Sequence, residues 1–166
     1  MTEHLLCDLM EKVSDKGFVN GSRTLAIIGN TLLFVGMAVF FFLIPLVFED
    51  KNKNLKFAQA LGVFAMANFL FLFSDHHDLV VLISGLMGTV VVFLLIKEYL
   101  KQRNTPVSGY AVFCLVLSIF VFFIFQSKIG IDILPTFQKT VFVLDGIWVT
   151  LSCYYLLKLP VERLRT

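Results

Sequence analysis

Apolar residues gather into five long runs that are separated by short polar segments. The runs cover residues 24–48, 57–73, 79–96, 109–125 and 140–157. The second and third contain no Asp, Glu, Lys or Arg, and the polar residues 74–78 join them. A helix rises about 1.5 Å per residue, so each run with its polar ends approaches the roughly 30 Å of a hydrocarbon core. The pattern predicts an all-α integral membrane protein, a five-span transmembrane helix bundle.

Composition supports a chain that lies mostly in lipid. Of its 166 residues 58% are hydrophobic and 16% are charged, whereas charged residues approach about a quarter of a soluble domain. Cys7, Cys114 and Cys153 form no CxxC pair, which argues against a disulfide framework or a zinc site. A net charge of +2 from scattered basic residues argues against a nucleic-acid partner. No cofactor is predicted.

The chain is expected to divide into residues 1–23 and a single transmembrane domain, residues 24–166. The first part lacks the basic start and continuous apolar centre of a signal peptide. Its apolar residues recur at helical spacing and predict a short amphipathic helix from Thr2 to Gly17. That helix either rests on the protein or the membrane interface, or docks to a partner.

The distribution of Lys and Arg predicts the orientation. Five crossings place the two termini on opposite sides, with nine of the basic residues on the side of the C-terminus and five on the other. All four tyrosines also fall near the basic boundary, as interface anchors do. Because basic residues are enriched in cytoplasmic loops, we expect an extracytoplasmic N-terminus and a cytoplasmic C-terminus.

Four polar residues are expected to share one depth in the membrane. Asn30, Asn68, Ser84 and Asp145 each lie five or six residues inside a different run. In each case the nearer end of the run faces the side that carries residues 74–78. At the helical rise, the four residues lie about 7 to 10 Å below that surface. They form the candidate polar intramembrane site.

Asp145 is the most informative member of this layer. An ionised carboxylate in hydrocarbon costs at least about 2.5 kcal/mol, so it is expected to face protein or water. No Lys or Arg lies at matching depth, which leaves amides, hydroxyls, a histidine or its own proton as companions. Two interpretations stay open: a protonated or amide-bonded helix contact, or a proton or cation site.

The polar segment between the second and third runs, residues 74–78, is a second candidate. Helix capping accounts for Ser74 or Asp75 as N-cap and for Asp78 near the positive helix end. It does not account for His76 and His77. Adjacent helical residues point about 100° apart, so one metal would need further ligands, for which the candidates are Asp75, Asp78, Asp132 and Asp145. The segment is therefore a candidate proton or metal site, with a titrating histidine pair as the alternative.

Small residues predict where helices approach closely. They form stripes at Ala58, Gly62, Ala65 and Asn68 in the second run and at Ser84, Gly85, Gly88 and Thr89 in the third, with Gly146 and Thr150 in the fifth. Such residues let membrane helices pack at short distance. Asn68 belongs to its stripe, so its side chain is expected to point into the bundle.

Three functional hypotheses fit these patterns, and none assigns a catalytic residue. The favoured one is a non-catalytic accessory, assembly or lipid- or ligand-binding protein, because no nucleophile, metal cluster or phosphate loop is evident. Its partners would be membrane lipids, a second copy or another membrane protein. The alternative is a proton- or cation-coupled transporter that uses Asp145 and the histidines. The third is a membrane-embedded metal-dependent hydrolase at residues 74–78.

Overall fold

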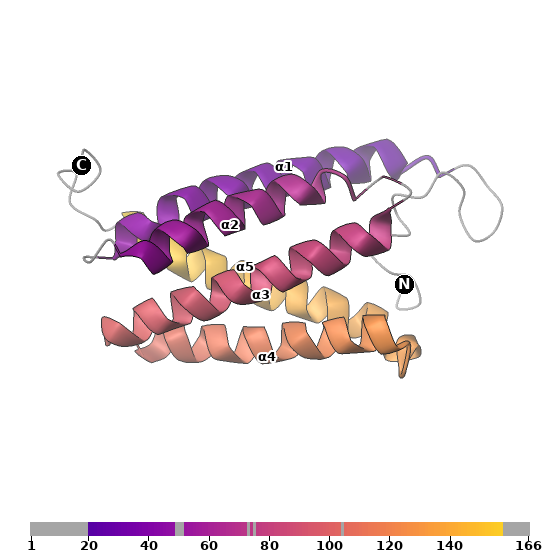
Figure 1. Cartoon of the computed structure of the whole chain (residues 1–166). Coiled ribbons are helices and arrows are strands. Elements are labelled where there is room, and N and C mark those ends of the chain that lie inside the picture. The colour runs from indigo at the N-terminus through magenta and orange to yellow at the C-terminus, as the bar shows by residue number, and fades with distance from the viewer. Residues whose placement is uncertain (1–19, 49–51, 73, 75, 104, 158–166) are drawn as a thin grey trace.

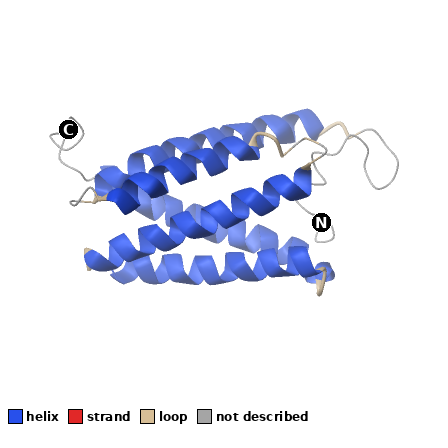
Figure 2. Cartoon of the chain, viewed as in Figure 1, coloured by secondary structure: helices blue, strands red, loops and turns tan. Residues whose placement is uncertain are grey.

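The computed structural model describes residues 20–48, 52–72, 74, 76–103 and 105–157, and the regular structure within them is entirely helical (Figure 1, Figure 2). The α-helices are α1 (Arg23–Leu43), α2 (Lys53–Phe69), α3 (His77–Lys101), α4 (Thr105–Ser127) and α5 (Leu134–Leu157). Two 3-10 helices, η2 (Ile44–Val47) and η3 (Ile131–Ile133), adjoin α1 and α5. The all-α prediction is confirmed. The predicted amphipathic helix lies outside the described residues.

Helix ends differ from the ends of the apolar runs. Helix α2 begins at Lys53, where the side chain of Asn52 accepts a hydrogen bond from the Leu55 N–H and so caps it. Helix α3 continues through its polar end to Lys101, and α5 begins at Leu134, before the apolar run starts. Apolar runs mark the length that suits lipid, whereas capping and backbone hydrogen bonds decide where a helix starts and stops.

The α-helix α1 ends two residues before Pro45. Proline has no N–H to donate into the preceding turn, so it disturbs the α-helical hydrogen bonding there. The α-helix stops at Leu43, and the chain continues as the 3-10 helix η2 up to Val47. This change brings Ile44 and Phe48 into the core, where both are buried.

The prediction that Ser74 or Asp75 caps the helix after residues 74–78 is wrong. The N-cap of α3 is His76, and no side chain caps it. The Ser74 Oγ instead accepts a hydrogen bond from the His76 N–H at 3.3 Å, which stabilises the turn before the helix. Asp78 does lie in the first turn, where its charge favours the positive end of α3.

Consecutive helices pack against each other as neighbours, and α5 returns to contact η2 (Figure 1). The main core lies where α1 and α3 end and α2 begins. There Phe48 packs against Tyr99 with ring centroids 5.0 Å apart, and Phe40 packs edge-on against Trp148 at 6.0 Å. Aromatic ring contacts that join α1 to α5 and the end of η2 to α3 therefore stabilise this end of the bundle.

The small-residue stripe on α2 packs as predicted. Ala58, Gly62 and Ala65 are buried, and a Cβ at Gly62 would stand 2.6 Å from the Phe41 ring of α1. The predicted contacts at the other glycines hold only in part. Gly85 meets the Phe122 ring of α4, but a Cβ at Gly88 or Gly146 would meet nothing within 4 Å. Thr150 is also exposed and donates to the carbonyl of Gly146 in its own helix.

Within the described residues, three helices are long and apolar enough to cross a membrane. They span Arg23–Val47, His77–Lys101 and Pro106–Ser127. Much of their outer surface consists of large apolar side chains, such as Leu32, Phe93 and Phe123, each more than half exposed. A contiguous exposed apolar surface of this kind is typical of protein that faces lipid.

Candidate functional site

Asn68 and Ser84 form one half of the predicted polar layer. The Asn68 Nδ2 donates to the Ser84 Oγ at 2.8 Å and to the Val80 carbonyl at 3.3 Å. The Ser84 Oγ in turn donates to the Ala65 carbonyl at 3.3 Å, and Ser84 is only 1% exposed. These bonds join the last turn of α2 to the second turn of α3, so Asn68 points inward as its stripe predicted.

Asp145 belongs to a separate pair between α4 and α5. The Ser118 Oγ donates to its Oδ2 at 3.4 Å, and the Cys114 thiol lies beside the carboxylate. Asp145 is partly buried and Cys114 is buried. The carboxylate is therefore held by neutral donors from α4, not by an amide or histidine of the predicted layer.

The two pairs lie at different depths. Gly85, beside Ser84, faces the Phe122 ring of α4. Ser118 comes four residues before Phe122 in α4, so the Asp145 pair is about 6 Å farther from residues 74–78. Asp145 itself is 11 residues from Leu134, the start of α5, or about 16 Å along the helix.

The side-chain amide of Asn30 bonds to the backbone of its own helix, α1. Its Nδ2 donates to the Ala26 carbonyl at 3.0 Å, one turn earlier in α1. The four predicted residues thus occur as an α2–α3 pair, an Asp145 site against α4, and an asparagine that bonds back onto its own helix. The depth argument predicted one shared layer, whereas Asp145 lies near the middle of α5 and apart from the α2–α3 pair.

Two partners of Asp145, Cys114 and Ser118, share a face of α4 with Tyr110, and this group was missed in the sequence. Tyr110, Cys114 and Ser118 are spaced four residues apart, and the Tyr110 hydroxyl donates to the Leu144 carbonyl at 3.3 Å. Residues at this spacing lie along one side of a helix. The spacing of three hydrogen-bonding side chains inside an apolar run was the available signal.

The described residues of the segment 74–78, which are Ser74, His76, His77 and Asp78, show no metal geometry. His77 Nδ1 lies 3.2 Å from Asp78 Oδ1, with the Asp78 side chain 81% exposed. His76 is exposed, and its N–H is bound by Ser74. Among the residues that the structure describes, no three His, Cys, Asp or Glu side chains cluster as metal ligands would. Asp75 lies outside those residues.

A second polar cluster lies at the opposite end of the bundle, beside the start of α2. Glu98 is 3% exposed, and its Oε1 accepts from Lys101 Nζ at 2.6 Å. Its Oε2 accepts from Asn52 Nδ2 at 2.9 Å, while Asn52 caps α2. The cluster therefore ties the end of α3 to the beginning of α2. It was missed because Glu98 lies in a polar stretch that the sequence presents as a surface extension.

Three further polar groups are buried next to this cluster. The hydroxyls of Tyr99 and Ser152 face each other across α3 and α5, and Trp148 lies one turn before Ser152. The two hydroxyls and the indole N–H have no well-aligned hydrogen-bond partner among the described residues. Buried polar groups of this kind weaken a helix contact unless a partner is supplied.

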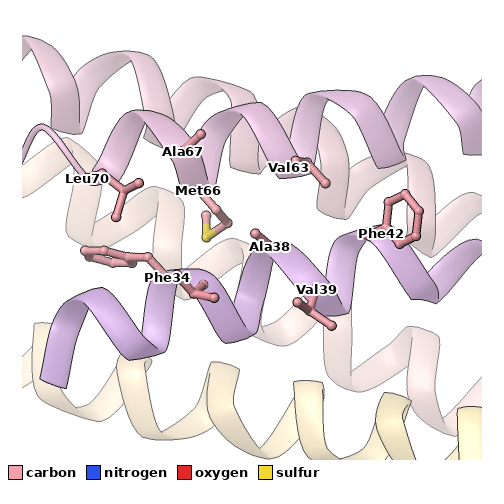
Figure 3. A pocket seen from close by; sticks show the side chains of 9 residues that line it. Phe34, Ala38, Val39, Phe42, Val63, Met66, Ala67 and Leu70 are labelled. Atoms are coloured by element: carbon pink, nitrogen blue, oxygen red, sulfur yellow. The ribbon is translucent and has the colours of Figure 1, made fainter. Parts of the chain in front are cut away.

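An apolar groove lies between α1 and α2 (Figure 3). It has a volume of about 320 Å³ and opens to the outside of the bundle. It is lined by Phe34, Val35, Ala38, Val39, Phe42, Val63, Met66, Ala67 and Leu70. The groove has the size of a small ligand site but lacks the polar groups that orient a water-soluble ligand.

No family model, curated protein or solved structure matches the chain.

Proposed function

We propose that the chain is a five-span, non-catalytic membrane protein that binds lipid in the groove between α1 and α2. The observation that carries this proposal is a groove lined entirely by apolar side chains on the outside of the bundle. Two pairs of polar residues inside the bundle, Asn68 with Ser84 and Asp145 with Ser118, are instead engaged between helices. In this proposal the polar side chains fasten the helices and the groove supplies the binding surface.

Two helices beyond the three candidate spans complete the proposed five. Helix α2 has 17 residues and α5 has 24, which correspond to about 25 Å and 36 Å. Each packs along a candidate span, α2 on α1 and α3 and α5 on α4. Each also exposes large apolar side chains, including Phe57 and Phe64 on α2 and Phe142 on α5. A bilayer that surrounds α1, α3 and α4 would therefore surround these two helices as well.

Lipid is the ligand that a groove of this kind favours. The site opens beside α1, one of the candidate spans, where acyl chains are the surrounding medium. Its lining offers contact by packing and no directed hydrogen bonds. A retained acyl chain would cover the exposed side chains of Val39 and Phe42, which are 52% and 61% exposed. An accessory or assembly role toward another membrane protein would use the same outer faces of α1 and α2.

The test is retention of lipid by the purified protein. The full chain, extracted in mild detergent, is reconstituted with a phospholipid that carries a photoreactive group in its acyl chain. We expect cross-links on Ala38, Met66 or Ala67 after illumination. The variant Ala67→Trp fills the groove and should remove most of them.

A matched control places the same bulk outside the groove. Leu86 on α3 is 54% exposed, so Leu86→Trp should leave the cross-links at α1 and α2 unchanged. Cross-links spread evenly over all helices, or equal labelling in Ala67→Trp and the unaltered chain, would contradict the proposal.

A proton-coupled transporter is the second candidate, and the surroundings of Asp145 favour it. The carboxylate is partly buried near the middle of α5, with the Ser118 hydroxyl and the Cys114 thiol beside it. A carboxyl with only neutral partners inside a membrane can take up and release a proton. In the transporter, His76 and His77 would exchange that proton with water.

Proton flux into proteoliposomes, followed with an enclosed pH-sensitive dye, tests this candidate. Asp145→Asn should abolish flux above that of protein-free liposomes, because an amide cannot carry the proton. Asp132→Asn, at an exposed position in η3, should leave it unchanged. Equal flux in the Asp145→Asn variant and the unaltered chain removes Asp145 from any transport mechanism.

A further inference from the structure

We infer that the groove between α1 and α2 selects an anionic phospholipid, with its phosphate at Lys56 and one acyl chain along the groove. This inference rests on the proposed lipid-binding function and adds the class of headgroup. It depends on the length of the groove, on the side chains at its polar end, and on the charges around that end.

The groove is slightly shorter than one leaflet, and on α2 it runs from Val63 in the middle of the helix to Leu70 at its end. It extends along α1 from Phe34 to Phe42, eight residues or about 12 Å (Figure 3). Half of a hydrocarbon core is about 15 Å. At the inner end the Phe34 ring stacks on Phe69 with centroids 5.1 Å apart, which joins α1 to α2 there. In the five-span arrangement, an acyl chain whose headgroup lies at the start of α2 would therefore enter the groove near the middle of the bilayer and end near the far end of α2.

The other end of the groove leads to a lysine. Lys56, Gln59, Val63, Met66 and Leu70 recur every three or four residues and so share one face of α2. The last three line the groove, and Lys56 lies about 10 Å beyond Val63 along the helix. The Lys56 side chain is exposed. The same face of α2 is therefore apolar at the depth of lipid tails and cationic at the depth of headgroups.

Gln59 marks the boundary between these two parts. Its Nε2 donates to the Phe42 carbonyl at 2.6 Å, near the end of α1 where carbonyls lack partners within the helix. This bond holds α1 and α2 together at the mouth of the groove. A phosphate beyond it would meet the Lys56 ammonium, with Lys53 one turn farther out and also exposed.

The charges around the mouth are complementary to an anionic headgroup. Glu98, the buried carboxylate near the start of α2, is already engaged by Lys101 and Asn52. Lys53 and Lys56, the described lysines at the start of α2, are both exposed. A zwitterionic headgroup carries its own ammonium and gains little from Lys56. An anionic one should be preferred about fivefold for each lysine close to its phosphate.

Native mass spectrometry of the full chain tests this preference. The protein is equilibrated with equal amounts of phosphatidylglycerol and phosphatidylcholine, and the ratio of the two bound lipids is measured. We expect enrichment of phosphatidylglycerol by several-fold and its loss in Lys56→Gln. Lys97→Gln is the matched control, because Lys97 is exposed near the same end of the bundle on α3. It should keep the enrichment of the unaltered chain.

Distinct results separate this inference from the lipid-binding function beneath it. If Ala67→Trp lowers binding of both lipids while Lys56→Gln leaves their ratio unchanged, the groove binds lipid but the headgroup inference is wrong. An equal fall in Lys56→Gln and Lys97→Gln would indicate general surface charge and would also overturn it. If Ala67→Trp has no effect on bound lipid, or only dissociates a dimer, both proposals fail.

Discussion

Asn68 and Ser84 illustrate what a single polar side chain does inside this bundle. Each is surrounded by apolar neighbours, and each satisfies its hydrogen-bonding groups across the contact between α2 and α3. Interhelical bonds of this type in membranes contribute about 0.6 kcal/mol on average and up to about 1.7 kcal/mol. The pair is therefore a modest local stabiliser of one helix contact.

Removing either side chain of this pair should destabilise the protein slightly, and the losses from the two single substitutions should not be additive. We expect Asn68→Ala and Ser84→Ala each to lower the free energy of unfolding by about 0.6 to 1.7 kcal/mol. The double variant should cost less than the sum of the two, because both remove the same bond. Unfolding in mixed micelles measures these values. Thr150→Val, which removes a hydroxyl bonded to its own helix, should have a smaller effect, and additive losses would argue against a coupled pair.

Among the polar residues, Glu98 is the one whose single substitution should lower the stability of the protein most. Its carboxylate is buried and accepts from Lys101 and from Asn52, which also caps α2. Glu98→Ala leaves the partly buried Asn52 amide without its acceptor, which costs about 1 to 3 kcal/mol. Glu98→Gln keeps a carbonyl oxygen for Asn52 and should recover part of the loss. Thermal unfolding of the two variants in the same detergent compares them, and equal losses would show that the amide cannot substitute.

At the scale of the helix pair, Gly62 decides how closely α1 and α2 approach. A Cβ at this position would stand 2.6 Å from the Phe41 Cγ, and Phe41 is itself buried in the core. The ring cannot move without disturbing its edge-on contact with Phe40, whose centroid lies 5.2 Å away. The glycine is thus required by a close helix contact, as its stripe of small residues predicted.

Substitution of Gly62 should therefore separate α1 from α2. We expect Gly62→Val to lower the free energy of unfolding by about 1 to 3 kcal/mol, the usual cost of overpacking. Gly29 provides a control in α1, because a Cβ there meets nothing within 4 Å. Gly29→Ala should be neutral or stabilise the helix by up to about 1 kcal/mol. A Gly62→Val variant as stable as the unaltered chain would contradict the close contact.

For the whole molecule, the number of crossings is the testable quantity. Three helices have the length and composition of spans, and the five-span proposal adds α2 and α5. Those two helices determine which loops share a side. If α2 crosses, Lys53 and His76 lie on opposite sides, and if α5 crosses, Ile131 and Leu157 do so.

Cysteine labelling in sealed vesicles measures these sides. In a chain from which Cys7, Cys114 and Cys153 have been replaced, we expect His76→Cys and Ile131→Cys to react with an impermeant reagent from one face. Lys53→Cys and Leu157→Cys should react only from the other. The basic distribution predicts that the second face is cytoplasmic. Labelling of positions 53 and 76 from the same face would mean that α2 does not cross.

Much of the fold was readable from the sequence, but little of the site was. Each of the five described α-helices overlaps one of the five apolar runs, and Asn68 faces the bundle as its neighbours Ala58, Gly62 and Ala65 predicted. The polar layer separated into two pairs at different depths, because an apolar run fixes neither the residue at which its helix starts nor the rotation of that helix about its axis. The Glu98 cluster was missed for a related reason, since burial of a charged residue near a helix end depends on which loop covers it.

The sequence by itself determined the helical class and the approximate positions of the helices. These follow from the lengths of apolar runs and from a constant rise per residue, both of which are properties of one segment at a time. Only the tertiary structure decided that Asp145 meets Ser118, that Glu98 binds Asn52 and that α1 and α2 leave an apolar groove. Each of these depends on the angle and distance between two helices, which the packing of side chains from the whole bundle sets together.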